Sequence, residues 1–366
     1  MKTIGQKGSW TKMSNDYLNE DYHKQLAQRY DARKTALDNE KMADVLKQLG
    51  FDIDAADIKK TVGGNVSGTF FAGDFVVKIQ SDRKRHEFLA NQIVSEKLGE
   101  KNLPIVKVLA YDHFENTDYE VLVMQKGQGK MLLEDFYRLS NEQQAELFGQ
   151  LFEVINQVSA IEMPDFGEIR LGQHFESFEK YLVAQFENYQ QIILNQKLAE
   201  AKDIRRISDY IYENIDIFND DKIAYFNHTD LHTGNLLYDG EKLTLLFDFD
   251  GAIKGPRYLI LPKLIGAIDD PSQFVEGTEY FAKYQCRKFD HLYKPLKEKM
   301  PEILAIPNLV RKLNIYGIIE GLKWISENWS AEWNANQIKN LLEIEMTSET
   351  QPLEETYYGK IFRKIA

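Results

Sequence analysis

The chain has 366 residues, of which 43% are hydrophobic and 28% are charged, a composition typical of a globular protein large enough for two lobes. Its 45 lysines and arginines face 57 aspartates and glutamates, and this net charge of −12 argues against a nucleic-acid partner, because a phosphate backbone needs a basic surface. The single cysteine excludes an internal disulfide, and no segment resembles a signal peptide or membrane span, so we expect a cytoplasmic protein without a membrane partner.

The first third of the chain predicts a small lobe built around an antiparallel sheet. Residues 1–36 are polar and lack a clear period, and we expect them to form an arm or an extra helix. One amphipathic helix is predicted from Asp38 to Gly50, and a second from Phe88 to Leu98. Five short β-rich runs bounded by glycines or polar turns complete the lobe: 58–62, 68–71, 75–79, 106–111 and 119–124.

A polar, glycine-containing segment at residues 125–129 predicts a hinge, so we divide the chain into an N-terminal lobe of residues 37–125 and a C-terminal lobe of residues 126–366. The second lobe is expected to be mainly helical, with one β interruption, a hairpin within residues 235–249. Its periodic helical segments are 141–161, 175–194, 201–218, 272–284 and 309–328. The whole pattern predicts an α+β fold with a cleft between two lobes.

Two short segments on either side of that hairpin carry residues suited to chemistry. The first reads His228-Thr229-Asp230-Leu231-His232-Thr233-Gly234-Asn235, and the second reads Phe247-Asp248-Phe249-Asp250. Phosphoryl transfer requires a positioned acceptor hydroxyl and a metal ion, and carboxylate and amide oxygens are ligands that suit Mg²⁺. Two histidines four residues apart would also suit zinc on a helix, but the glycine and the missing glutamate after the first histidine favour a loop.

This signature resembles that of the aminoglycoside phosphotransferase and choline kinase family, small-molecule relatives of the protein kinases: His-x-Asp-Leu-His-x-x-Asn, then a hairpin, then Asp-Phe. The resemblance implies a bilobal protein-kinase-like fold, with a five-stranded antiparallel sheet and one helix in the small lobe and a mainly helical large lobe. By position it implies that Asp230 is catalytic and orients the acceptor hydroxyl, and that Asn235 and Asp248 bind magnesium. Asp250 stands where relatives have a small residue, and we expect it to face solvent or cap a turn. Leu259 replaces an aspartate that anchors the catalytic loop in relatives.

The small lobe offers candidate contacts for a nucleotide. The loop at residues 63–68 reads Gly-Gly-Asn-Val-Ser-Gly, and Gly64, Asn65 and Ser67 are expected to bring backbone N–H groups close to phosphate oxygens. Thr69-Phe70 follows the loop where a Walker A motif requires Lys-Ser or Lys-Thr, which argues against a P-loop enzyme. Met124, at the end of the last strand of this lobe, is the candidate for contacting the base.

Lys78 lies inside an apolar strand, where a buried ammonium group needs an anionic partner such as phosphate. The resemblance implies that this lysine also pairs with an acid of the following helix. Glu87 and Glu96 are the candidates, and Glu87 is preferred because it lies nearer the apolar face of the helix, whereas Glu96 is expected to be solvated.

These features predict a kinase that moves the γ-phosphate of ATP or GTP, with Mg²⁺, to a hydroxyl of a small cationic molecule. An aminoglycoside-type antibiotic is the favoured acceptor, with antibiotic resistance as the role. The alternative is a metabolic kinase for choline, ethanolamine, thiamine, a sugar or homoserine. An inactive nucleotide-binding module is disfavoured by the complete residue set, and a protein kinase by the missing Ala-Pro-Glu segment. We expect a monomer or homodimer. Candidate acceptor contacts in the helical lobe are Phe175, Tyr181, Phe186, Tyr189, Asp269, Asp270, Glu320 and Trp324.

Overall fold

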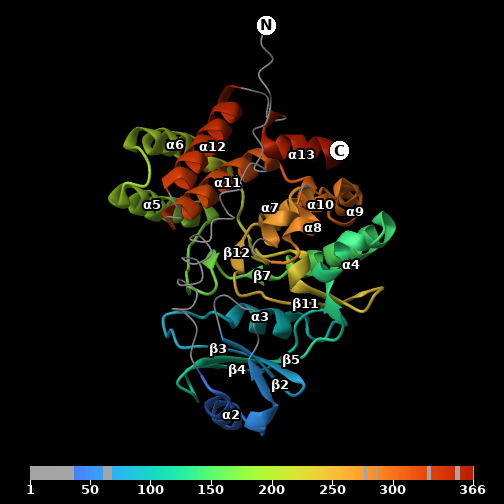
Figure 1. Cartoon of the computed structure of the whole chain (residues 1–366). Coiled ribbons are helices and arrows are strands. Elements are labelled where there is room, and N and C mark those ends of the chain that lie inside the picture. The colour runs from blue at the N-terminus through green and yellow to red at the C-terminus, as the bar shows by residue number, and fades with distance from the viewer. Residues whose placement is uncertain are drawn as a thin grey trace.

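The computed structural model describes residues 37–60, 68–275, 278–285, 287–327, 331–350 and 355–365. Figure 1 shows a small lobe with a β-sheet below a larger lobe that is mostly helical. The predicted N-terminal arm lies outside the described residues. The boundary at residues 125–126 stays a prediction, and the α+β, kinase-like arrangement of two lobes is confirmed.

The small lobe contains one antiparallel sheet of five strands in the order β1-β2-β3-β5-β4, as predicted. The chain enters it through α2 (Asn39–Gln48), whose N-cap Asp38 accepts a 2.8 Å hydrogen bond from the backbone N–H of Lys41. A second helix, α3 (Leu89–Leu98), follows the third strand. The strands are β1 (Ile58–Lys60), β2 (Gly68–Ala72), β3 (Phe75–Gln80), β4 (Val108–His113) and β5 (Glu120–Gln125).

The alternation of side chains along the central strands sorts residues between the two faces of this sheet. Val77 of β3 and Val123 of β5 are fully buried against α2 on the outer face. Lys78 pairs in register with Leu122, and both side chains lie on the opposite face, which looks toward the large lobe and is covered by α3 (Figure 1). The alternation of side chains along β3 therefore places Lys78 on the face of the sheet that looks toward the large lobe.

The start of α3 is fixed by Glu120, a fully buried residue of β5. Its carboxylate accepts 2.9 Å hydrogen bonds from the backbone N–H groups of both Glu87 and Phe88. It also accepts a 3.0 Å bond from the hydroxyl of Tyr111 in β4. A negative charge at a helix N-terminus satisfies donors that have no partner within the helix. The sheet thus sets the position of α3 next to the cleft.

The large lobe is built from helices that pack around one extended apolar core. Four of the predicted helical segments correspond to observed helices with ends within a few residues of the prediction. The helices are α4 (Asn141–Val158), α5 (Phe178–Gln196), α6 (Ala201–Asn214), α7 (Leu261–Asp269), α8 (Phe281–Tyr284), α9 (Tyr293–Lys299), α10 (Pro301–Leu304), α11 (Leu309–Ser326), α12 (Ala331–Thr350) and α13 (Tyr357–Ile365). Among the described residues, no helix is both long enough and apolar enough to cross a lipid bilayer.

The predicted helix at residues 272–284 is wrong. The chain forms a short 3₁₀ helix, η8 (Pro271–Phe274), and then α8. The side chain of Thr278 donates a 2.6 Å hydrogen bond to the carbonyl oxygen of Val275 and accepts a 3.2 Å bond from the N–H of Tyr280. Side-chain bonds of this kind compete with helical backbone bonds, which explains why the apolar period does not become one helix.

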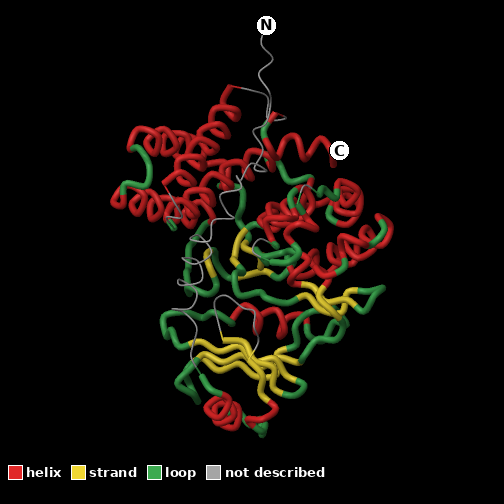
Figure 2. The backbone as a smooth tube through the Cα atoms, in the orientation of Figure 1, coloured by secondary structure: helices red, strands yellow, loops and turns green. Residues whose placement is uncertain are grey.

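The predicted hairpin is confirmed as β10 (Leu236–Tyr238) and β11 (Leu243–Leu246), but it is not the only β structure of this lobe. A four-stranded sheet in the order β7-β9-β12-β8 lies beside it (Figure 2), so the prediction of one β interruption is wrong. Strands of two to four residues are too short for a detectable period, and their partners are far apart in sequence. The remaining strands are β6 (Lys130–Met131), β7 (Glu162–Met163), β8 (Gly167–Glu168), β9 (Ala224–Asn227) and β12 (Ile253–Gly255).

Candidate active site

A cavity of about 1060 Å³ lies between the lobes and is lined by residues from both. Lys78 and Met124 reach it from the small lobe, and Asp230, Asn235 and Asp248 reach it from the large lobe. Five residues singled out from the sequence therefore share one space. The predicted phosphate contacts Gly64, Asn65 and Ser67 lie outside the described residues.

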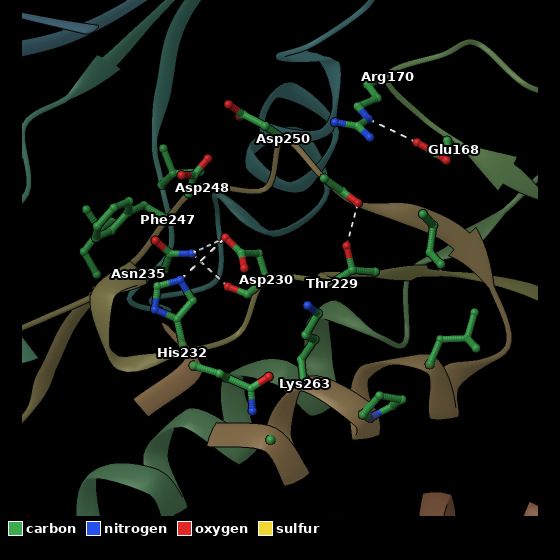
Figure 3. Close-up of a pocket in the computed structure, with 18 of the residues that line it drawn as sticks. Glu168, Arg170, Thr229, Asp230, His232, Asn235, Phe247, Asp248, Asp250 and Lys263 are labelled. Carbon is green, nitrogen blue, oxygen red and sulfur yellow. Dashed lines mark hydrogen bonds and ion pairs between the residues drawn. The ribbon is translucent and has the colours of Figure 1, made fainter. Parts of the chain in front are cut away.

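Asp230 and Asn235 are joined directly on the loop that follows β9 (Figure 3). The amide nitrogen of Asn235 donates a 3.0 Å hydrogen bond to Oδ2 of Asp230 and a 2.8 Å bond to its backbone carbonyl oxygen. The amide oxygen of Asn235 is turned away from Asp230 and remains available as a ligand atom. The five-residue spacing between Asp230 and Asn235 lets the two side chains meet, because the amide of Asn235 bonds back to Asp230 across the loop.

Two histidines hold the same loop through backbone atoms. His228 is fully buried, its Nδ1 accepts the N–H of Asp230 at 3.3 Å, and its Nε2 donates to the carbonyl oxygen of Phe247 at 3.3 Å. Burial lowers the pKa of His228 to about 4, so the ring is neutral at physiological pH. Nδ1 of His232 accepts the N–H of Gly234 at 3.1 Å. Three of the four ring nitrogens of these histidines are therefore used to hold the backbone of this region.

The carboxylate of Asp230 is ionised and accessible. Burial alone would raise its pKa, but Nε2 of His232, which lies 3.6 Å from Oδ2 of Asp230, and the positive charge of Lys263 outweigh burial and lower the pKa below its ordinary value. Figure 3 shows Lys263 of α7 pointing toward the Asp230 loop. The side chain of Asp230 is 46% exposed, so a ligand in the cavity can reach it.

Lys78 binds two carboxylates of the large lobe. Its Nζ lies 2.8 Å from Oδ1 of Asp248 and 2.7 Å from Oδ2 of Asp250. Burial would lower the pKa of Lys78, but the two negative charges outweigh burial and raise it. The backbone φ of Asp248 is 66°, a left-handed conformation that is uncommon outside glycine and that concentrates at functional sites.

Two expectations about acidic residues are wrong in this structure. Glu87 does not pair with Lys78, because its carboxylate lies 3.2 Å from Arg85 and 3.7 Å from Arg170. Asp250 does not face solvent, because its side chain is only 15% exposed and contacts Lys78. The contacts of Glu87 with Arg170 and of Asp250 with Lys78 join the two lobes, and the pattern of a single helix or turn does not contain such contacts.

The loop that carries Asp230 and Asn235 is anchored without the aspartate that the resemblance led us to expect in place of Leu259. Thr229 Oγ1 donates a 2.6 Å hydrogen bond to the carbonyl oxygen of Gly251, and the amide of Asn227 donates a 3.0 Å bond to the carbonyl oxygen of Gly255. Leu259 instead packs against Gly255, where an added Cβ would lie 2.5 Å from its Cδ1. Neither residue was singled out from the sequence, although Thr229 lies within the recognised motif and Asn227 directly precedes it.

The part of the cavity wall that comes from α5, α11 and α13 is rich in aromatic side chains. Three of the eight candidate acceptor contacts line it: Tyr181, Glu320 and Trp324. Tyr316, Tyr357 and Tyr358 line it as well and were not singled out from the sequence. The candidates that do not line the cavity are Phe175, Phe186, Tyr189, Asp269 and Asp270.

The five-stranded small lobe, the helical large lobe and the cleft between them define a kinase-like fold. The model of a family described as "Phosphotransferase enzyme family" matches residues 60–259, which include Lys78, the loop with Asp230 and Asn235, and the hairpin. The chain belongs to this family, and the resemblance seen in the sequence is confirmed. No curated protein is significantly similar to the chain in sequence.

Solved structures with the same fold include several aminoglycoside phosphotransferases. The ADP-bound structure of APH(2'')-Ib is 17% identical, with a TM-score of 0.56 over 87% of this chain and 99% of that one. A thermostable mutant of APH(4)-Ia in ternary complex with AMP-PNP and hygromycin B is 16% identical, with a TM-score of 0.57 over 86% and 100%. The gentamicin complex of APH(2")-IIa is 16% identical, with a TM-score of 0.58 over 85% and 99%. At these identities the similarity shows the shared fold.

Proposed function

We propose that this protein is a small-molecule kinase that moves the γ-phosphate of ATP or GTP to a hydroxyl of an amine-bearing acceptor. The observation that carries the proposal is the set of groups that line one cavity. Lys78, Asp248 and Asp230 share it with Glu320 and several aromatic residues. A donor phosphate and an acceptor hydroxyl would then meet at Asp230.

The small-lobe end of the cavity suits a nucleotide base. Val106, Met124, Leu237 and Leu245 line an apolar part of the cavity beside the chain that links the lobes. Gly127 sits within this lining, where an added Cβ would lie 2.6 Å from Leu245 and 2.7 Å from Leu237. The absence of a side chain there keeps the walls close together without a clash, as a flat ring requires.

Asn235 and Asp248 fit a magnesium ion that arrives with the nucleotide. Asn235 has a free amide oxygen, and the side chain of Asp248 is 37% exposed. In the described part of the chain no three His, Cys, Asp or Glu residues are grouped as a metal centre, and Mg²⁺ commonly takes one or two protein carboxylates with substrate phosphates. When bound, the ion would neutralise negative charge on the phosphates.

Asp230 is suited to orient the acceptor rather than to remove its proton early. Its lowered pKa makes it an ionised but weak base, and Asn235 fixes one of its two carboxylate oxygens. A hydroxyl that donates to the carboxylate is aligned for attack on phosphorus. In a loose transition state the proton leaves late, so positioning contributes more than base strength.

Glu320 and the aromatic rings around it support an amine-bearing acceptor. Glu320 lines the cavity together with Tyr181 and Tyr316, and its negative charge raises the pKa of both phenol groups, after the larger effect of burial and, for Tyr181, of Glu168. A carboxylate beside aromatic faces favours ammonium groups. Similar folds bind gentamicin, kanamycin and hygromycin B, which makes an aminoglycoside the leading acceptor and antibiotic resistance the leading role.

A metabolic kinase for choline, ethanolamine, thiamine, a sugar or homoserine is the second candidate function. The aromatic lining around one acid also fits a molecule with a single ammonium group. An inactive binding module is disfavoured because Lys78, Asp230, Asn235 and Asp248 all line the cavity. We further propose that the enzyme works in the cytoplasm as a monomer or homodimer.

The proposed function is tested by following triphosphate consumption with ATP and GTP against aminoglycosides, macrolides, choline and sugars, with mass spectrometry of the products. We expect an amine-bearing product heavier by one phosphoryl group. Glu320→Gln should raise the acceptor KM about ten-fold without changing the nucleotide KM, because one charge-assisted contact is lost. Glu213→Gln, the same change on the exposed face of α6, is the matched control. Consumption without any modified acceptor would reject the proposal.

A further inference from the structure

The two carboxylates that bind Lys78 both come from the large lobe, but we assign them different roles. Asp248 and Asp250 are two residues apart, and both bind the same ammonium group. Asp248 is also a proposed magnesium ligand, so a bound ion would compete with Lys78 for this carboxylate. Asp250 is then the carboxylate that can keep hold of the lysine.

Asp250 is itself held from the small lobe by Asn91 of α3. The amide nitrogen of Asn91 donates a 2.7 Å hydrogen bond to Oδ1 of Asp250, while Oδ2 of Asp250 faces Lys78. The amide oxygen of Asn91 accepts the backbone N–H of Phe249 at 3.4 Å. Asn91 is fully buried, so its amide has a fixed orientation. It forms hydrogen bonds with both the backbone of Phe249 and the side chain of Asp250.

The two acids in and next to α3, Glu87 and Glu96, have partners other than Lys78. Glu87 lies before the first turn, where Arg85 and Arg170 neutralise it. Glu96 is exposed and bonds to Gln92 one turn earlier on the same helix. The side chain that α3 directs toward the lysine's environment is therefore the uncharged Asn91, acting through Asp250.

We propose that Asp250 is the positioning residue that orients the Lys78 ammonium group toward the triphosphate, with Asn91 as its support. The inference rests on the proposed nucleotide-binding function. Here the negative charge beside the lysine is supplied by the large lobe, and the small-lobe helix supplies only an amide. Because Lys78 and Asp250 sit on different lobes, the lysine is aligned only while the lobes are held together.

The test compares Asp250→Asn in the wild-type background and in a Lys78→Met background, with the affinity for AMP-PNP measured by calorimetry. Asparagine keeps the shape and the contact with Asn91 but removes the charge that holds the lysine. We expect about a ten-fold loss of affinity in the wild-type background, the size expected for one hydrogen bond to a charged group, and less than about two-fold in the Lys78→Met background. A residue that acts through Lys78 has no effect once Lys78 is gone.

Two further variants separate positioning from folding and metal binding. Asn91→Ala should also weaken AMP-PNP binding, because it removes the support of Asp250. It provides a second test of the proposal if Asp250→Asn does not fold. Glu96→Gln, on the exposed side of α3, should bind as the wild type does. The measurements are repeated in EDTA, because a metal ligand would lose its effect there and a positioning residue would not.

The outcomes are distinct. Unchanged affinity in Asp250→Asn, an equal loss in both backgrounds, or a loss confined to Mg²⁺ would each overturn the inference. A larger loss in Glu87→Gln than in Asp250→Asn would return the role to the small-lobe acid. Failure of the wild type to phosphorylate any acceptor would count against the proposed function alone, since AMP-PNP binding does not require an acceptor.

Discussion

Replacing Asp230 with asparagine is expected to stop phosphoryl transfer while leaving the nucleotide bound. The two side chains have the same shape, so Asn235 keeps an oxygen acceptor at that position. Asp230 lines the cavity, and the described ion pairs of Lys78 are with Asp248 and Asp250 rather than with Asp230. The change therefore removes a charge at the reacting hydroxyl and little else.

The size of the effect follows from two contributions of one carboxylate. A charge-assisted hydrogen bond to the acceptor hydroxyl is worth about 1.5–3 kcal/mol, a factor of roughly 10 to 100. A positioned proton acceptor contributes about 10²- to 10⁴-fold. Because the lowered pKa of Asp230 makes it a weak base, we expect the lower part of that range, a fall in kcat of about 10²- to 10³-fold. The nucleotide KM should change by less than about three-fold.

The assay is steady-state nucleotide consumption with the best acceptor, together with AMP-PNP affinity by calorimetry and a thermal melt. Asp239→Asn is the matched control, because it makes the same change at the exposed turn of the neighbouring hairpin, outside the cavity. Wild-type kcat in Asp230→Asn would refute the catalytic assignment. A loss of AMP-PNP affinity as large as the loss of turnover would instead place Asp230 among the nucleotide contacts.

Three further predictions follow from neighbouring groups. Asp248→Ala should weaken AMP-PNP binding about 10- to 100-fold in Mg²⁺ and hardly at all in EDTA; equal losses in both buffers would contradict its role as a ligand. His228 has a folded pKa of about 4 against 6.5 when unfolded, so the unfolded chain gains the proton first as pH falls, and about 3 kcal/mol of stability should disappear between pH 6.5 and 4. Denaturant titrations of His228→Gln should lack that part of the pH dependence. Lys312→Met should cost about 3–5 kcal/mol, because it leaves buried Asp221 without its 2.8 Å partner, and a melting temperature equal to the wild type would disprove this.

The grouping of the candidate site residues in one cavity was predictable because three of them are close in sequence. Asp230, Asn235 and Asp248 lie within one loop and one hairpin, so their spacing already brings them together. The faces of the small-lobe strands were predictable for a similar reason, since a two-residue period decides which side chains point to the cleft. Lys78 is aimed at the site by that period alone.

The partners of these residues were decided by tertiary contacts. Whether Lys78 meets Glu87 or Asp250 depends on how two lobes pack, and 172 residues separate Lys78 from Asp250 in the chain. The four-stranded sheet and the aromatic end of the cavity likewise join segments with no local signal. Periodicity, capping and turn chemistry are properties of neighbouring residues and can be read from the sequence. Charge pairing in a cleft is a property of the assembled fold, because it depends on which surfaces have lost their water.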